Sequence, residues 1–467
     1  MIKILLLSIY ILSIITVIFI ERKNPTEALL WVFVMVCLPY VGTLLYLIFG
    51  NTTTIKWRVH SRKKRLNQVN MRSNMDHLPI IHKALSQEDE KVMHFNYVYN
   101  QSSIVSYETI QVFTNGREHY EKLFEDIKNA KNVIYVEFYT IQKDIVGQKF
   151  VEALTQKARE GVSVYVLCDS FANLSTPKSF FKELVKAGGK VIRVKPYLTH
   201  YRSHRKIVVI DSVVSYIGGM NIGNQYANLA KHKNPWRDTQ VRLTGECNQI
   251  LIQYFLEDWL CAVSKKNLDS TIEYVQSLKL PYYSPSSNLC QFVVGGVDTN
   301  KESVKMMYLS MISSAKEKIR IQSPYFIPDR SILDALKTAA AAGVQVEIMI
   351  PGIKASFFLD PVTTYYCGQL LEYGAKVYKY NGYIHAKTMI VDDEVCAIGS
   401  VNMDIRSLTV DDEICGIFYA NSFVKSYSKI YDEDIQNCQK YTLQQFEKRG
   451  YFEKFMEGFF LLFAPLM

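Results

Sequence analysis

A chain of 467 residues is long enough for two or three domains. With 48% hydrophobic and 21% charged residues, its composition excludes a wholly disordered protein and fits a globular or membrane-attached one. The formal net charge of +9 permits anionic partners, such as nucleic acid or acidic lipid, without choosing between them. The nine cysteines include no Cys-x-x-Cys pair, which favours reduced thiols over disulfides or a zinc site.

Two uncharged apolar stretches begin the chain, at residues 4–20 and 28–49. Each is long enough to cross the hydrocarbon core of a bilayer, so the sequence predicts a transmembrane hairpin within residues 1–50. A cleaved signal peptide is the alternative for the first stretch, but no small-residue cleavage site follows it. Pro39 is expected to kink the second helix.

A basic segment, KWRVHSRKKR at residues 56–65, follows the hairpin. The positive-inside rule then predicts a multi-pass protein of the cell membrane whose long carboxy-terminal portion lies on the cytoplasmic side. The basic segment is either simply solvated or attracts anionic head groups. Residues 51–105 are expected to form this juxtamembrane segment and a linker.

The rest of the chain is an internal duplication. Residues 129–141 resemble 314–327, and residues 152–167 resemble 334–350, at a nearly constant offset. Each copy shows a helix, a β-rich strand, a second helix closed by a glycine and another strand. In the first copy, the first helix is expected at residues 117–130 and the last strand at residues 162–169. Helices that alternate with short apolar strands predict the α/β class.

A stretch rich in proline and serine, residues 277–290, marks the boundary between the copies. The first lobe is therefore expected at residues 106–280 and the second at residues 281–467. The second lobe ends in FEKFMEGFFLLFAPLM, which is either a core-packing helix or a segment lying in the membrane interface. Its last part, residues 459–467, is too short to span a bilayer.

The two copies share one polar motif, HRKIVVID with a trailing GGMN in the first and HAKTMIVD with a trailing GSVN in the second. In both copies we expect the motif to sit on a β-branched apolar strand. Side chains two residues apart on a strand point the same way, so each histidine should pair with a lysine. The pairs are His204 with Lys206 and His385 with Lys387.

The chemistry of these pairs suits a phosphate. An ammonium group beside each imidazole repels metal cations but donates to phosphate oxygens. Histidine has a pKa near 6.5, suitable for proton transfer, and can itself be a nucleophile. Two histidines could therefore divide the work at one phosphorus if the lobes pack about a pseudo-two-fold axis. Asp211 and Asp392 fall where each strand should turn, and we expect them to brace the motif.

The doubled motif resembles the phospholipase D superfamily, and its flanks resemble bacterial cardiolipin synthases. The resemblance also rests on WRDTQVRLTG in the first copy and on SPYFIP and DDEICGIFY in the second. It implies a bilobal α/β fold with no metal or cofactor and a phosphohistidine intermediate. It further implies transfer of a phosphatidyl group between two phosphatidylglycerols of the bilayer, giving cardiolipin and glycerol.

The resemblance also implies roles for individual residues. His204 and His385 would be nucleophile and acid/base, with His204 favoured as the attacking group. Asp238 and Glu413 would orient the histidines. The expected phosphate ligands are Lys206, Lys387, Asn221, Ser400 and Asn402. Two positions depart from the pattern: Gly219 stands where the second copy has Ser400, and Ser203 stands where relatives often have asparagine.

Three other functions are compatible with the same motifs. If water took the phosphatidyl group, the protein would be a phospholipase D hydrolase that makes phosphatidic acid. A phosphodiesterase or nuclease of the superfamily would suit the net positive charge, but the predicted hairpin argues against nucleic acid as a partner. A catalytically inactive membrane scaffold is disfavoured because both motifs are intact.

Overall fold

The computed structural model describes residues 2–20, 25–50, 59–60, 62, 64–67, 69, 87–195, 202–229, 234–281, 283–284, 286–296, 302–354, 356–419 and 422–464. The chain divides into two compact units, one built on residues 1–68 and the other on residues 69–194 and 202–467. Most of the basic segment predicted at residues 56–65 lies outside the described residues.

The first unit is a group of apolar helices around a small core of Val17, Met35 and Tyr46. The expected kink occurs at Leu38, because Pro39 has no N–H with which to continue the preceding helix. Among the residues described, no helix combines the length and apolar content needed to cross a bilayer, and the transmembrane hairpin stays a prediction. The elements are α1 (Ile2–Ile15), η1 (Thr16–Ile20), α2 (Pro25–Cys37), α3 (Pro39–Leu45) and η2 (Tyr46–Gly50).

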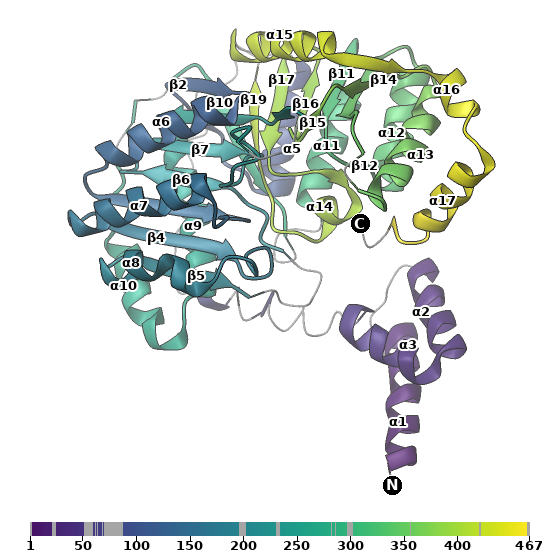
Figure 1. Ribbon diagram of the computed structural model, residues 1–467, viewed down its shortest axis with the longest axis horizontal. Coiled ribbons are helices and arrows are strands. Elements are labelled where there is room, and N and C mark those ends of the chain that lie inside the picture. The colour runs from purple at the N-terminus through teal and green to yellow at the C-terminus, as the bar shows by residue number, and fades with distance from the viewer. Residues whose placement is uncertain are drawn as a thin grey trace. The chain divides into compact units, whose positions relative to one another are not determined.

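The second unit contains two lobes, each built on one mixed β-sheet (Figure 1). The sheet of the first lobe has the strand order β2-β9-β7-β6-β3-β4-β5, in which β3, β4 and β5 are parallel. Its strands are β2 (Thr109–Phe113), β3 (Val133–Phe138), β4 (Ser163–Asp169), β5 (Lys190–Val194), β6 (Ile207–Ile210), β7 (Val214–Gly218) and β9 (Gln240–Thr244).

The sheet of the second lobe repeats this order as β10-β19-β17-β16-β11-β13-β14, with β1 and β20 added at its edges. The predicted duplication is therefore confirmed strand by strand. The strands are β1 (Val105–Ser106), β10 (Leu289–Val294), β11 (Lys318–Gln322), β13 (Gln345–Pro351), β14 (Lys376–Tyr380), β16 (Thr388–Val391), β17 (Val395–Gly399), β19 (Ile414–Tyr419) and β20 (Cys438–Tyr441).

Helices cover both faces of each sheet, as the alternation of helix and strand predicts (Figure 1). The outer face of the first sheet packs on α6 (Gly116–Asn129), α7 (Ile145–Arg159) and α8 (Lys182–Lys186). The outer core of the second lobe includes α5 (Gln87–Asn100), α11 (Ser303–Ser314), α12 (Arg330–Ala341) and α13 (Leu359–Leu371). Further helices are η4 (Lys178–Phe181), η5 (Lys265–Asn267), α10 (Leu268–Ser277), α14 (Ile405–Thr409), α16 (Leu443–Glu447) and α17 (Tyr451–Leu461).

A third core joins the two lobes. It lies between the sheets and contains buried side chains from α9 (Cys247–Ala262) and α15 (Ser422–Gln436), together with residues of both sheets such as Val209 and Ile398. Tyr135 faces this shared core, whereas its neighbours Ile134 and Val136 face the outer core of the first lobe. This alternation along β3 has the period of two that a buried strand requires.

The linker predicted at residues 51–105 contributes ordered elements to the second lobe. Val92 and Met93 of α5 belong to the same core as Met307 of α11, and β1 pairs with β10. The chain thus adds a helix and an edge strand to the second lobe before it builds the first. The predicted boundaries at residues 105 and 280 remain predictions.

Candidate active site

The two motif segments lie directly before β6 and β16, where the lobes meet. The His204 N–H donates to the carbonyl of Asp412 at 2.8 Å, and the His385 N–H donates to the carbonyl of Arg237 at 2.6 Å. Ser203 forms a parallel bridge with Asp412. The prediction that each motif sits on a strand is therefore wrong for the His-Lys pairs, because the backbone of each histidine bonds to the opposite lobe before its own strand begins.

A second reciprocal contact reinforces this exchange. The short strand β15 (Tyr383–Ile384) of the second lobe pairs in parallel with β8 (Trp236–Arg237) of the first. Each motif histidine is thus held by backbone bonds to a segment of the other lobe. In both cases that segment carries an acidic residue at its next position, Asp238 after Arg237 and Glu413 after Asp412.

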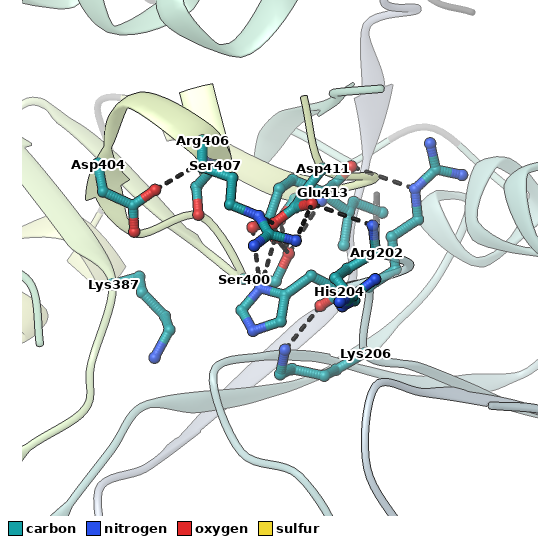
Figure 2. A network of polar contacts seen from close by, with 12 residues as sticks. Arg202, His204, Lys206, Lys387, Ser400, Asp404, Arg406, Ser407, Asp411 and Glu413 are labelled. Carbon is teal, nitrogen blue, oxygen red and sulfur yellow. Dashed lines mark hydrogen bonds and ion pairs between the residues drawn. The ribbon is translucent and has the colours of Figure 1, made fainter. Parts of the chain in front are cut away.

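Each histidine consequently receives its carboxylate from the opposite lobe. The Nδ1 atom of His204 lies 2.8 Å and 3.0 Å from the two carboxylate oxygens of Glu413 (Figure 2). The Nδ1 atom of His385 lies 2.6 Å from Asp238 Oδ2. A carboxylate at Nδ1 fixes the tautomer and leaves Nε2 for chemistry, so the geometry fits the orienting role expected for both acids.

The difference between Gly219 and Ser400 matches the difference between these two acids. A Cβ atom on Gly219 would lie 2.1 Å from Asp238 Oδ1, so any side chain there would displace the shorter acid. Glu413 has one more methylene group, and beside it the Ser400 hydroxyl donates to Glu413 Oε2 and accepts from the Ile414 N–H. The site therefore contains two size-matched pairs.

Both motif lysines are buried beside the histidines. Lys206 Nζ donates to the carbonyl of His204 at 2.6 Å, and Lys387 Nζ contacts the carbonyl of His385 and lies 2.8 Å from its Nδ1. Burial lowers the pKa of Lys206 to about 7 and that of Lys387 to about 8. An anion bound between them would favour the charged forms, because a nearby opposite charge raises the pKa of an ammonium group.

The surroundings of both histidines lower their pKa values. Burial, followed by the charges of Lys206 and Lys387, lowers the pKa of His204 well below its ordinary value. Burial and Lys387 lower the pKa of His385 to about 4, against the opposing effect of Asp238. Because both lysines act on His204 and on His385, the two motifs form one electrostatic centre.

The two orienting acids differ in charge state. Burial raises the pKa of Glu413 to about 7. Burial acts in the same direction on Asp238, but Lys387 and His385 outweigh it and hold the pKa of Asp238 below its ordinary value. At neutral pH, Asp238 is therefore ionised and Glu413 lies near its titration midpoint.

Asp211 and Asp392 lie away from the two histidines and accept hydrogen bonds from the backbone, which fits the bracing role expected of them. Asp211 accepts from the backbone N–H groups of Lys131, Asn132 and Val133 at 2.6–2.9 Å. Asp392 accepts in the same way from the residues that lead into β11, which are Lys316, Glu317 and Lys318. Both aspartates have positive φ, a conformation that aspartate tolerates better than most residues.

The neutral side chains expected to bind phosphate differ in how many hydrogen bonds they already make within the protein. The Asn221 amide donates to the Tyr226 hydroxyl at 2.7 Å, and its Oδ1 accepts from the Thr140 N–H at 3.2 Å. The Ser400 hydroxyl is taken up by Glu413. Asn402 Oδ1 is buried without a hydrogen-bond partner among the described residues. Of the neutral phosphate ligands predicted from the sequence, Asn402 is thus the one whose side chain is least occupied by other hydrogen bonds.

The family assignment rests on sequence comparison with known proteins. The family model for "Cardiolipin synthase, PLD-like domain" matches residues 123–259 and 308–435, more than half of the chain. The chain belongs to the cardiolipin synthase family. It is therefore an enzyme of the phospholipase D superfamily, as its motifs indicate. A second model, "Phospholipase_D-nuclease N-terminal", matches residues 8–51.

Individual cardiolipin synthases match over nearly their full lengths. The major cardiolipin synthase ClsA of Bacillus subtilis is 35% identical, with 100% of this chain and 99% of the relative covered. A cardiolipin synthase of Listeria welshimeri is 33% identical, with 96% and 95% covered. Among solved structures, phosphatidylserine synthase from Haemophilus influenzae has a TM-score of 0.62 at 17% identity, and the match covers 80% of this chain and 98% of that one. At that identity the likeness concerns the fold.

Aromatic rings flank both histidines of this cardiolipin synthase-family chain. The repeated His-Lys motifs did not predict them. Tyr139 packs against His204 with ring centroids 4.8 Å apart. Trp236 and Tyr226 pack against His385 at 5.4 Å and 5.6 Å. The sequence held one signal, because Tyr139 follows β3 at nearly the position that Tyr325 holds after β11 in the repeat.

A network of charges supports the loop that carries Glu413 in this cardiolipin synthase-family site (Figure 2). The Arg406 guanidinium lies 2.9 Å from Asp411, and the same carboxylate accepts from the Arg202 N–H at 3.1 Å. Asp404 caps α14 through the Ser407 N–H at 2.7 Å. Ser203, which stands where relatives often have asparagine, is not part of this network. Its hydroxyl donates to Glu137 at 2.9 Å.

Proposed function

We propose that this protein transfers a phosphatidyl group from one phosphatidylglycerol to another and releases glycerol, forming cardiolipin through a phosphohistidine. The observation that carries the proposal is the crossed arrangement of two histidines. Each has its Nδ1 held by a carboxylate of the other lobe, and both lie beside the same two buried lysines. Two Nε2 atoms are thereby left for an in-line exchange at one phosphorus.

In the first step, Nε2 of His204 attacks the phosphorus of a phosphatidylglycerol. A bond forms between nitrogen and phosphorus, and the bond from phosphorus to the glycerol oxygen breaks. His385, which enters this step as an imidazolium with its Nδ1–H held by Asp238, donates a proton from Nε2 to that oxygen, so that glycerol leaves as a neutral alcohol. Lys206, Lys387 and Asn402 hold the non-bridging phosphate oxygens, because they offer donors and positive charge where negative charge collects.

In the second step, the terminal hydroxyl of another phosphatidylglycerol takes the place that glycerol left. His385 accepts the hydroxyl proton, the oxygen bonds to phosphorus, and the bond to His204 breaks. Cardiolipin is released and both histidines return to their starting states. Water must be kept from the intermediate for transfer to prevail over hydrolysis, and the aromatic rings of Tyr139 and Trp236 are placed to help exclude it.

The assignment of His204 as nucleophile follows from the unequal acids. His385 must carry positive charge before the first step and again after the second, and the ionised Asp238 stabilises that imidazolium. Glu413 is only partly ionised near neutral pH and is therefore the weaker partner for a cation. A neutral His204 is suited to attack, whereas His385 is suited to hold the proton.

The membrane location belongs to the same proposal. Residues 4–20 and 28–49 would form two membrane-spanning segments at the cell membrane, and the basic run at 56–65 would keep the lobes on the cytoplasmic side. Large apolar side chains such as Ile4, Phe19 and Leu29 are exposed to the surroundings of the helices, as contact with lipid requires. A substrate confined to the bilayer explains why a phosphatidyltransferase would carry such a segment.

The test is mass spectrometry of lipids after the purified full-length protein has been incubated with phosphatidylglycerol vesicles. Cardiolipin and free glycerol should appear in equal amounts, EDTA should change neither, and His385→Ala should abolish both. Phosphatidic acid without cardiolipin would contradict transfer and make water the acceptor. Cleavage of DNA by the protein, with phosphatidylglycerol left intact, would instead establish the nuclease alternative.

A further inference from the structure

The last described helix, α17, has large apolar side chains on its outer face as well as on its inner one. Phe452, Phe455, Phe459 and Leu462 recur at the three- and four-residue spacing that places side chains on one face of a helix. Phe452 is 73% exposed, Phe455 67% and Leu462 73%. A surface helix normally buries its apolar face against the core and exposes a polar one. The exposed face of α17 is apolar instead.

A neighbouring loop extends this apolar surface. Phe357, which is 70% exposed, and Phe358 precede α13, and both rings pack against the buried ring of Phe460 on the inner face of α17. Phe459 in turn contacts Phe460 and Phe463. We call the exposed set the phenylalanine surface, formed by Phe357, Phe358, Phe452, Phe455, Phe459 and Leu462. The helix α17, which carries most of this surface, lies at the outer end of the second lobe (Figure 1).

The phenylalanine surface is held in a fixed relation to the active site. Phe460 packs on Ile327 and Val362 in a small separate core. Ile327 belongs to β12 (Phe326–Ile327), which pairs with β18 (Met403–Asp404) directly after Asn402. One short strand pair therefore links the inner face of α17 to the catalytic motif of the second lobe. Whatever binds the surface is positioned relative to that motif.

We propose that the phenylalanine surface inserts into the interfacial region of the bilayer that contains the substrate. The inference rests on the proposed function, because the acyl chains of phosphatidylglycerol stay in the bilayer while its phosphate must reach His204. Phenylalanine on an amphipathic helix is suited to the boundary between head groups and acyl chains. The net charge of +9 favours approach to a bilayer rich in anionic phosphatidylglycerol and disfavours a second, equally charged copy of the chain.

The depth of insertion can be measured on the full-length protein in phosphatidylglycerol proteoliposomes. Phe455→Trp places a fluorophore on the surface, and Val185→Trp, at an exposed apolar position on α8, is the matched control. The four native tryptophans are accounted for by subtracting the parent signal. Phosphatidylglycerol with brominated acyl chains should quench the tryptophan at 455 several-fold more than that at 185. Equal quenching at the two positions would overturn the proposal, whether or not the protein self-associates.

A second measurement connects insertion with turnover. The triple variant F452E/F455E/F459E should lower the ratio of activity on vesicles to activity on dissolved short-chain phosphatidylglycerol about tenfold, because charged side chains resist burial among acyl chains. Val185→Glu should leave the ratio unchanged. An unchanged ratio in the triple variant would contradict docking. Should the parent protein convert neither substrate, the proposed function fails, while the quenching experiment still decides whether the surface inserts.

Discussion

At the scale of residues, the active site is built from two unequal pairs. Gly219 stands beside Asp238, and Ser400 stands beside Glu413. Gly219 has no side chain and so leaves room for the shorter Asp238. The longer Glu413 fits beside Ser400 and accepts a hydrogen bond from its hydroxyl. The pairs are alternative solutions to one packing problem, and exchanging one member alone should disturb a histidine of the opposite lobe.

The first prediction tests this coupling. Gly219→Ser should lower kcat/KM by about a hundredfold, because the new side chain displaces Asp238 from His385 and a small misplacement of a catalytic group is costly. The double variant Gly219→Ser/Asp238→Glu should recover a substantial part of the loss by copying the pair at Ser400 and Glu413. Steady-state kinetics on short-chain phosphatidylglycerol provide the measurement. Activity in the double variant no higher than in Gly219→Ser would show that the pairs are not size-matched.

The second prediction concerns pH. The ionised form of Glu413 accepts the Nδ1 proton of His204, and burial raises its pKa to about 7. Activity should therefore fall as the pH drops through about 7, where the carboxylate becomes protonated. Glu413→Gln retains a hydrogen-bond acceptor but does not titrate. Its activity should be lower and should not show this fall at acid pH, the acid limb of the pH profile.

Asp238→Asn is the control for that experiment, since the pKa of Asp238 is already below its ordinary value and contributes no step near neutrality. The acid limb should persist in this variant at reduced activity. Rate profiles of kcat/KM between about pH 5 and 9 compare the two variants. An acid limb that survives in Glu413→Gln would assign the titration to another group.

At the scale of elements, the motif aspartates fasten one strand pair to the next. The turn between β6 and β7 reaches back through Asp211 to three N–H groups at the start of β3, and Asp392 does the same for β11. The bonds lie at the far end of β6 and β16 from the histidines. They hold the strands that carry the site while touching no reacting group.

The third prediction follows from those bonds. Asp211→Ala should lower the free energy of unfolding by about 1–3 kcal/mol, because backbone donors lose their acceptor. The activity of the folded fraction should remain close to that of the parent. Asp211→Asn should recover part of the stability, since asparagine also accepts hydrogen bonds and tolerates positive φ. Denaturant unfolding and kinetics on the same samples separate stability from catalysis; a large loss of kcat at full stability would make Asp211 a catalytic residue.

The elements themselves were largely predictable from the sequence, because local periodicity determines them. The helix predicted from residues 117–130 is α6, and the strand predicted from 162–169 is β4. The exchange of Asp238 and Glu413 between lobes was not predictable, because it depends on how two sheets pack. The same holds for the packing of aromatic rings against His204 and His385, because the sequence does not show which ring lies beside which histidine. The position of each His-Lys pair before its strand also depends on backbone bonds to the other lobe.

At the scale of the whole molecule, the two lobes form one catalytic body and share a core, so neither can supply a complete site alone. The compact unit of residues 69–194 and 202–467 has its own cores, distinct from the small core of the helices at the amino terminus. Folding and catalysis should therefore belong to this unit. Residence at the bilayer would be shared between the amino-terminal helices and the phenylalanine surface.

The fourth prediction separates these contributions. A chain that begins at Val69 should unfold at nearly the same temperature as the main unit of the full-length protein and should convert short-chain phosphatidylglycerol at a similar rate. Its activity on vesicles should fall by about a hundredfold or more. The amino-terminal helices would act as a tether that raises the effective concentration of the phenylalanine surface at the bilayer, and the shortened chain lacks them. Adding F452E/F455E/F459E to the shortened chain should remove most of the vesicle activity that remains. Vesicle turnover equal to that of the full-length protein would mean that the amino-terminal helices are not needed to bring the site to its substrate.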